Sequence, residues 1–144
     1  MENSLLSWQF WALLSAIFAA LTAIFAKIGI EHIHSDFATF LRTIVVLCFL
    51  AGIVWTTRQY QSLSSISFRS LFFIVLSGLA TGASWLCYFR ALKLGNASQV
   101  APIDKLSVVL VAIFGVMFLS ERLTMANWAG VGLIAIGALL VAVT

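Results

Sequence analysis

Five apolar stretches separated by short polar segments make up almost the whole chain. Each stretch is nearly free of charge, and the connections between them have only four to eleven residues. A helix needs about twenty residues to cross the hydrocarbon core, because every backbone amide must be paired within the segment there. The pattern therefore predicts five transmembrane helices, over residues 5–26, 37–56, 68–89, 97–119 and 124–143.

Composition agrees with this pattern and leaves no segment for a water-soluble domain. The 144 residues are 62% hydrophobic and only 9% charged, whereas soluble domains are about half apolar and about a quarter charged. We expect an all-α membrane protein with one five-helix domain, surrounded by membrane lipids. The eight Lys and Arg are scattered singly, which argues against nucleic acid as a partner.

Small residues at four-residue spacing predict close helix packing, because they allow two backbones to approach. Three predicted helices carry such pairs, and the pair in the third helix suits either packing within the chain or a dimer contact. The predicted packing residues are Ala16, Ala20, Gly78, Gly82, Ala126 and Gly130.

Orientation in the membrane normally follows an excess of Lys and Arg in cytoplasmic loops. Here the side that holds the N-terminus carries Arg58, Arg69 and Arg122, and the other side carries Lys27, Arg90 and Lys93, which is three against three. Adding Arg42 and Lys105, which lie within predicted helices near the second side, gives only three against five.

This weak bias leads to the hypothesis of dual topology. The chain would insert both ways and pair as an antiparallel homodimer, supplying between two copies the inverted symmetry that many transporters hold within one chain. The alternative is a single orientation, set by the insertion machinery or by a different partner chain.

Asp104 and Lys105 are the most informative polar residues, since a fourth helix that begins near Ala97 places them about 10 Å along its axis. Charges at such depth usually face a bundle interior or a watery cavity. Neighbours on a helix point about 100° apart, so we expect the two not to pair with each other. Lys105 is then a contact for an anionic or zwitterionic substrate group, Asp104 a proton-coupling site, and Arg42 a candidate partner for Asp104. Alternatively, the helix begins near Ile103 and both charges lie at the headgroup level, with Asp104 stabilised at the helix N-terminus.

Other polar or aromatic positions within the spans are candidates for a substrate pathway, each with a structural alternative. The stem of Arg42 is long enough to carry its guanidinium to the interface. Trp85 lies deep in the third span and also suits packing between helices, and hydroxyl groups in helices often bond their own backbone. The predicted pathway residues are Arg42, Thr81, Ser84, Trp85, Asp104, Lys105 and Ser107.

No enzyme, cofactor or metal site is predicted. Glu31, His32, His34 and Asp36 crowd one loop, but their spacing matches no diagnostic metal-binding pattern, and a solvated turn is favoured. The chain has no nucleophile elbow, phosphate-binding glycine loop or zinc-protease helix.

The C-terminal half carries a recognisable pattern. Arg90-Ala91-Leu92-Lys93 is followed by Gly95-Asn96-Ala97-Ser98, then by an apolar helix, the corner Leu119-Ser120-Glu121-Arg122-Leu123-Thr124 and a glycine-studded last helix. This pattern resembles the EamA-like branch of the drug/metabolite transporter superfamily, and the segment from Phe37 to Arg42 is similar to the family's second helix. The resemblance covers nearly the whole chain as one EamA-type repeat.

The resemblance implies a carrier that needs a partner. Members usually hold two such units in one polypeptide, the second inverted, around a cavity that moves small metabolites or drugs. With one unit, this chain is expected to be a secondary transporter in the inner (plasma) membrane, working by alternating access as an antiparallel homodimer or within a heteromer. The alternative is a non-transporting subunit or assembly partner of another carrier. The four-helix multidrug exporters of the superfamily use a glutamate in their first helix, and this chain has no acid between Glu2 and Glu31.

Overall fold

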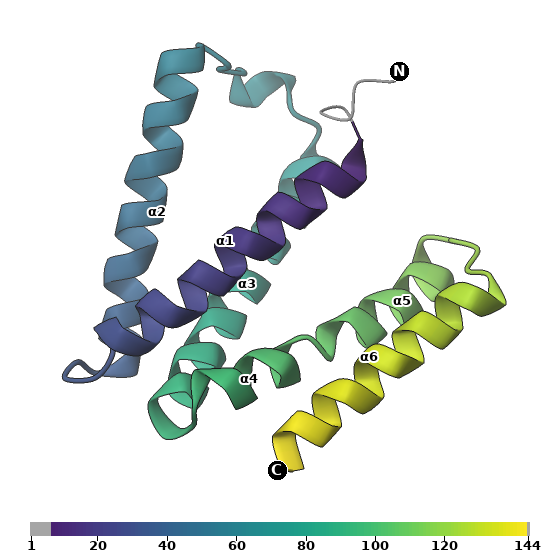
Figure 1. Cartoon of the computed structure of the whole chain (residues 1–144). Coiled ribbons are helices and arrows are strands. Elements are labelled where there is room, and N and C mark those ends of the chain that lie inside the picture. The colour runs from purple at the N-terminus through teal and green to yellow at the C-terminus, as the bar shows by residue number, and fades with distance from the viewer. Residues whose placement is uncertain (1–6, 144) are drawn as a thin grey trace. The chain divides into compact units, whose positions relative to one another are not determined.

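A computed structural model describes residues 7–143, which are almost entirely helical. Five helical segments are long and apolar enough to cross a membrane, as the hydropathy pattern predicts (Figure 1). This confirms the five expected helices of an all-α membrane protein. The helices are α1 (Trp8–Gly29), α2 (Ser35–Thr57), the short 3₁₀ turn η2 (Leu63–Ser65), α3 (Phe68–Leu94), α4 (Ala97–Asp104), α5 (Ser107–Phe118) and α6 (Met125–Val143).

Several boundaries differ from the hydropathy pattern. The expected start of the first span, Leu5, lies outside the described residues. Helix α3 continues beyond Phe89 to Leu94, so Arg90 and Lys93 are helical and the connection to α4 is only Gly95 and Asn96. Hydropathy marks the end of the apolar run, but Arg and Lys are good helix formers that allow the helix to continue.

The fourth membrane-spanning segment, Ala97–Phe118, matches the expected span over 97–119 but contains an interruption. Helix α4 ends at Asp104 and α5 begins at Ser107. Pro102 lies inside α4 and has no N–H to donate to the preceding turn. Tighter bonds span the break, with the amides of Leu106 and Val108 donating to the carbonyls three residues earlier. The alternative, a helix that begins only near Ile103, is not found, because α4 begins at Ala97.

The chain divides into two compact units, which we describe separately. The terminal unit comprises Met1–Lys27 and Leu94–Thr144, and the central unit comprises Ile28–Lys93. In the terminal unit, α6 runs beside both α4 and α5 (Figure 1). Its buried residues include Ala23, Gly115 and Ala138, all small, which is typical of helices that pack closely within a membrane.

The buried residues of the central unit lie at one of its ends. Ile30 follows α1, Thr39 is in the first turns of α2, and Phe89 and Leu92 are in the last turns of α3. The side chains of Ile30 and Leu92 are 1% and 0% exposed. Most other large apolar side chains of the described residues are exposed, so lipid or another protein chain must cover them.

Candidate functional site

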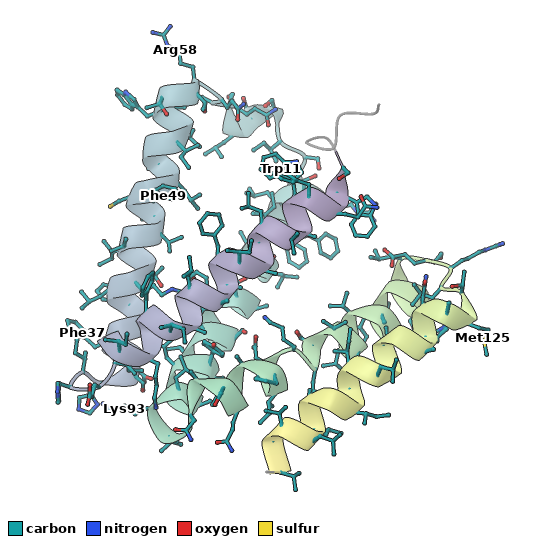
Figure 2. All side chains as sticks on the ribbon, in the orientation of Figure 1. Trp11, Phe37, Phe49, Arg58, Lys93 and Met125 are labelled. Carbon is teal, nitrogen blue, oxygen red and sulfur yellow. The ribbon has the colours of Figure 1, made fainter. Side chains whose placement is uncertain are left out.

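Lys93 ties the end of α3 to the turn between α1 and α2. Its Nζ donates hydrogen bonds to the backbone carbonyls of Ile30, Glu31 and Ile33 at 2.9, 3.2 and 2.8 Å. Carbonyls near a helix C-terminus lack helical partners and attract positive charge. Lys93 and Phe37 lie near one end of the central unit and Arg58 near the other (Figure 2).

Asp36 and Arg90 form a two-pronged ion pair beside this turn. Arg90 Nε donates to Asp36 Oδ1 at 3.0 Å, and a terminal nitrogen of Arg90 donates to Oδ2 at 2.7 Å. The fork geometry of a guanidinium matches a carboxylate in this way. The side chains of Arg90 and Asp36 are 59% and 54% exposed, so water screens the attraction and the pair orients α2 on α3 more than it stabilises the fold.

Charge exchange tests this orienting role. We expect Asp36→Asn and Arg90→Gln each to lower the Tm by only about 3 °C or less, because exposed ion pairs contribute little. The double variant Asp36→Arg with Arg90→Asp should recover most of that loss. Thermal unfolding in detergent, followed by tryptophan fluorescence, measures all three, and a double variant no better than the sum of the singles would contradict the pairing.

Arg42 packs against aromatic rings of α3 in the central unit. The carbon at the centre of its guanidinium lies 4.1 Å from the ring centre of Trp85 and 5.6 Å from that of Phe89. These distances are within the range of cation–π attraction, which is strongest for Trp. Two predicted pathway residues, Arg42 and Trp85, are therefore brought together. The expected pairing of Arg42 with Asp104 stays a prediction, because the two residues belong to different units.

Asp104 and Lys105 pair with each other at the break in the fourth span, which corrects the expectation that they do not pair. Lys105 Nζ lies 3.2 Å from Asp104 Oδ2. The expectation considered only the directions in which the two side chains leave the helix, whereas the flexible four-carbon stem of lysine carries Nζ to the neighbouring carboxylate. The charge of Lys105 is therefore balanced by its neighbour.

The hydroxyl-bearing pathway candidates are not gathered into one site. Thr81 donates to the carbonyl of Ser77 in its own helix at 2.9 Å. Ser84 is exposed on α3 in the central unit, and Ser107 is exposed at the start of α5 in the terminal unit. Their pathway role stays a prediction.

The predicted packing residues are open to further contacts. Nothing in their own units lies within 4 Å of the position that a Cβ would take on Gly78, Gly82 or Gly130. Ala16, Ala20 and Ala126 are exposed as well. If these faces pack, as we predict, their partner is outside the unit that carries them.

The polar turn between α1 and α2 lines a pocket of about 350 Å³. Its walls include His32, His34 and Lys93. Within residues 7–143, no group of three or more His, Cys, Asp or Glu is placed to hold a metal ion. The interpretation of this turn as a solvated segment stays a prediction.

Sequence reasoning missed three tertiary roles of charged residues. Arg90, Lys93 and Lys27 were counted only as loop charges, yet Arg90 pairs with Asp36, Lys93 binds three carbonyls, and Lys27 donates to the carbonyl of Gly95 at 2.7 Å. The signal available was their clustering at the ends of predicted helices, where unpaired carbonyls are found.

The corner between α5 and α6, residues 119–124, has a geometry with a clear physical basis. Ser120 has a φ of 55°, and the amides of Leu119 and Glu121 both donate to the carbonyl of Gly115. A Cβ on Gly115 would lie 2.6 Å from a carboxylate oxygen of Glu121. The glycine therefore makes room for the folded-back glutamate side chain.

Comparison with known proteins identifies relatives over most of the chain. The model of the EamA-like transporter family matches residues 6–143. A Sinorhizobium protein named "uncharacterized transporter in cobO 3'region" is 66% identical over 137 residues, which cover 95% of this chain and 97% of that protein.

Two more distant relatives differ in size and printed role. A protein of Vibrio cholerae named "uncharacterized transporter" is 23% identical over 91% of this chain, which corresponds to only 41% of the relative. A probable 4-amino-4-deoxy-L-arabinose-phosphoundecaprenol flippase subunit, ArnE, of Hamiltonella defensa is 28% identical over 50% of this chain and 65% of its own length. No solved structure matches.

Proposed function

This chain belongs to the EamA-like transporter family, and on that premise we propose that it carries a small metabolite or drug-like solute across the membrane by alternating access. Membership over residues 6–143 is the observation that carries the proposal. The family and the transporter-named relatives point to a multi-pass membrane transport protein rather than an enzyme. The inner (plasma) membrane is the proposed location, in keeping with the helical spans.

The working unit is an antiparallel homodimer. Alternating access requires the path to open in turn to both faces, and inverted repeats provide equivalent halves for this motion. The Vibrio relative is more than twice as long as the segment it shares with this chain, which leaves room for a second unit in that relative. In the proposed homodimer another copy supplies this unit. The open glycine positions Gly78 and Gly82 on α3 supply a surface on which a second copy can pack closely.

The break between α4 and α5 is the proposed coupling element. Discontinuous membrane helices in transporters carry substrate and ion sites, because free backbone groups are available there. The pair of Asp104 and Lys105 lies at this break, and mutual neutralisation lowers the cost of placing both charges in the membrane. Protonation of Asp104 would release Lys105, which provides a route for a proton to alter the local charge during transport.

Reporter fusions test the antiparallel arrangement. We expect two C-terminal fusions, one active only inside the cell and one active only outside, both to show activity, because six of the eight cations divide evenly between the two sides. The same pair of reporters on a membrane protein of fixed orientation is the control. Activity from only one fusion would remove dual topology.

Reconstitution tests the transport role. Proteoliposomes should show solute exchange that Lys105→Met reduces, while Arg69→Met, a change of an exposed cation at the start of α3, leaves it unchanged. Unaltered exchange in Lys105→Met would remove Lys105 from the pathway.

The ArnE similarity favours one rival, a non-transporting subunit of a heteromeric carrier. In that case the charges at the break would select a helix of the partner chain. Co-purification of a different membrane protein in fixed ratio, together with no flux by the isolated chain for any solute, would favour this rival.

A further inference from the structure

Arg42 differs from every other Lys and Arg of the central unit. Arg90 pairs with Asp36, and Lys93 binds backbone carbonyls. Arg58 directly follows the end of α2, and Arg69 is the second residue of α3. Arg42 follows the start of α2 by seven residues, which places its backbone about 10 Å along the helix axis. Within residues 28–93 it has no carboxylate partner, although an unpaired cation within a membrane span is costly.

The guanidinium of Arg42 is held in place but keeps its hydrogen-bonding capacity. Its contacts with the rings of Trp85 and Phe89 orient the group through its π-face and leave its in-plane N–H groups free. Arg42 makes no side-chain hydrogen bond within the central unit. Its unpaired nitrogen atoms are accessible to solvent. An arginine fixed in this way is suited to bind an oxyanion through two parallel hydrogen bonds.

We infer that Arg42, braced by Trp85, binds the carboxylate or phosphate group of the transported solute. The inference rests on the proposed transport function and assigns the class of substrate, a small organic anion or zwitterion. The sequence favours Lys105 for this contact, but Lys105 is already balanced by Asp104 at 3.2 Å. Arg42 has no such internal competitor in its unit.

A lipid phosphate offers the same chemistry as a soluble oxyanion, and the position of the guanidinium favours the soluble one. Phe89 adjoins Arg90, whose partner Asp36 marks the start of α2 and hence the membrane surface. Trp85 lies one turn further from that surface. The guanidinium is closer to Trp85 than to Phe89, so it does not extend toward the headgroups as a snorkelling arginine does.

Ligand binding to the full chain in phosphatidylcholine nanodiscs tests the inference. The probes are acetate, benzoate and inorganic phosphate, with uncharged benzamide as the matched control for benzoate. We expect at least one oxyanion to give a saturable change in tryptophan fluorescence that Trp85→Phe removes and Trp55→Phe, at the far end of α2, retains. Arg42→Gln should raise the Kd roughly tenfold or more, because charge-assisted hydrogen bonds to the ligand are lost. Arg42→Lys should retain part of the affinity, and Arg58→Gln is the control.

Each outcome separates the inference from its rivals. No response to any oxyanion, an equal response to benzamide, or unchanged affinity in Arg42→Gln would overturn it. An Arg42-dependent fluorescence change produced by phosphatidylglycerol alone would assign the site to lipid instead and overturn the solute site. Oxyanion binding without flux would support the site at Arg42 and contradict the carrier proposal. Flux of neutral solutes without oxyanion binding would support the carrier proposal and contradict the site.

Discussion

Replacing Leu92 by Ala should destabilise the protein far more than the same truncation of the exposed leucine two residues further along α3. Leu92 is 0% exposed and lies in the same unit as the 1% exposed Ile30. Truncation of a fully buried leucine removes its packing contacts and leaves a cavity, which costs about 2–4 kcal/mol. Titration with SDS, monitored by tryptophan fluorescence, measures the change in the free energy of unfolding.

Leu94 provides a matched control for this prediction. It is two residues further along the same helix and is 90% exposed. Leu94→Ala should change the free energy of unfolding by about 0.5 kcal/mol or less, as is usual for exposed positions. Equal effects of the two truncations would show that the end of α3 is not packed as described.

Replacing Lys93 by Met should give the second largest loss. The variant keeps a long apolar side chain but loses the hydrogen bonds that Nζ donates to the carbonyls of Ile30, Glu31 and Ile33 at 2.8–3.2 Å. Hydrogen bonds to a charged group are stronger than neutral ones, but Lys93 is exposed, so we expect a loss of about 1–2 kcal/mol in total.

Hydrogen exchange locates this effect. In Lys93→Met, the amides at the start of α2 should exchange faster, because the turn that precedes them is released. Arg69→Met at the other end of α3 is the control and should leave both the stability and the exchange unchanged. Faster exchange throughout the chain, or none at the start of α2, would contradict a local role for Lys93.

The fold was largely predictable because hydropathy and length are local properties. Each apolar run must satisfy its own backbone in lipid, so helix number and type follow directly. The break in the fourth span was harder to predict. Pro102 is visible in the sequence, but a proline within a membrane helix permits a helix with altered geometry as well as a break.

The candidate site was predictable only in part. Arg42 and Trp85 were both selected as unusual residues within spans, yet nothing in the sequence says that one lies 4.1 Å from the other. Asp104 and Lys105 were selected for their depth, and their predicted separation was wrong because it neglected the reach of the flexible lysine side chain.

Sequence alone determined that this chain has five helices able to span a membrane and a nearly even division of cations between the two sets of predicted loops, since these properties follow from hydrophobic length and the positions of Lys and Arg. The tertiary structure alone decided which charges are balanced. Arg90, Lys93 and Lys105 find partners within their own units, and within its unit Arg42 meets aromatic rings rather than an acid. The attraction between two charges depends on the distance between their side chains to within a few ångströms. Helix packing and backbone turns set this distance, and the hydropathy pattern carries no information about it.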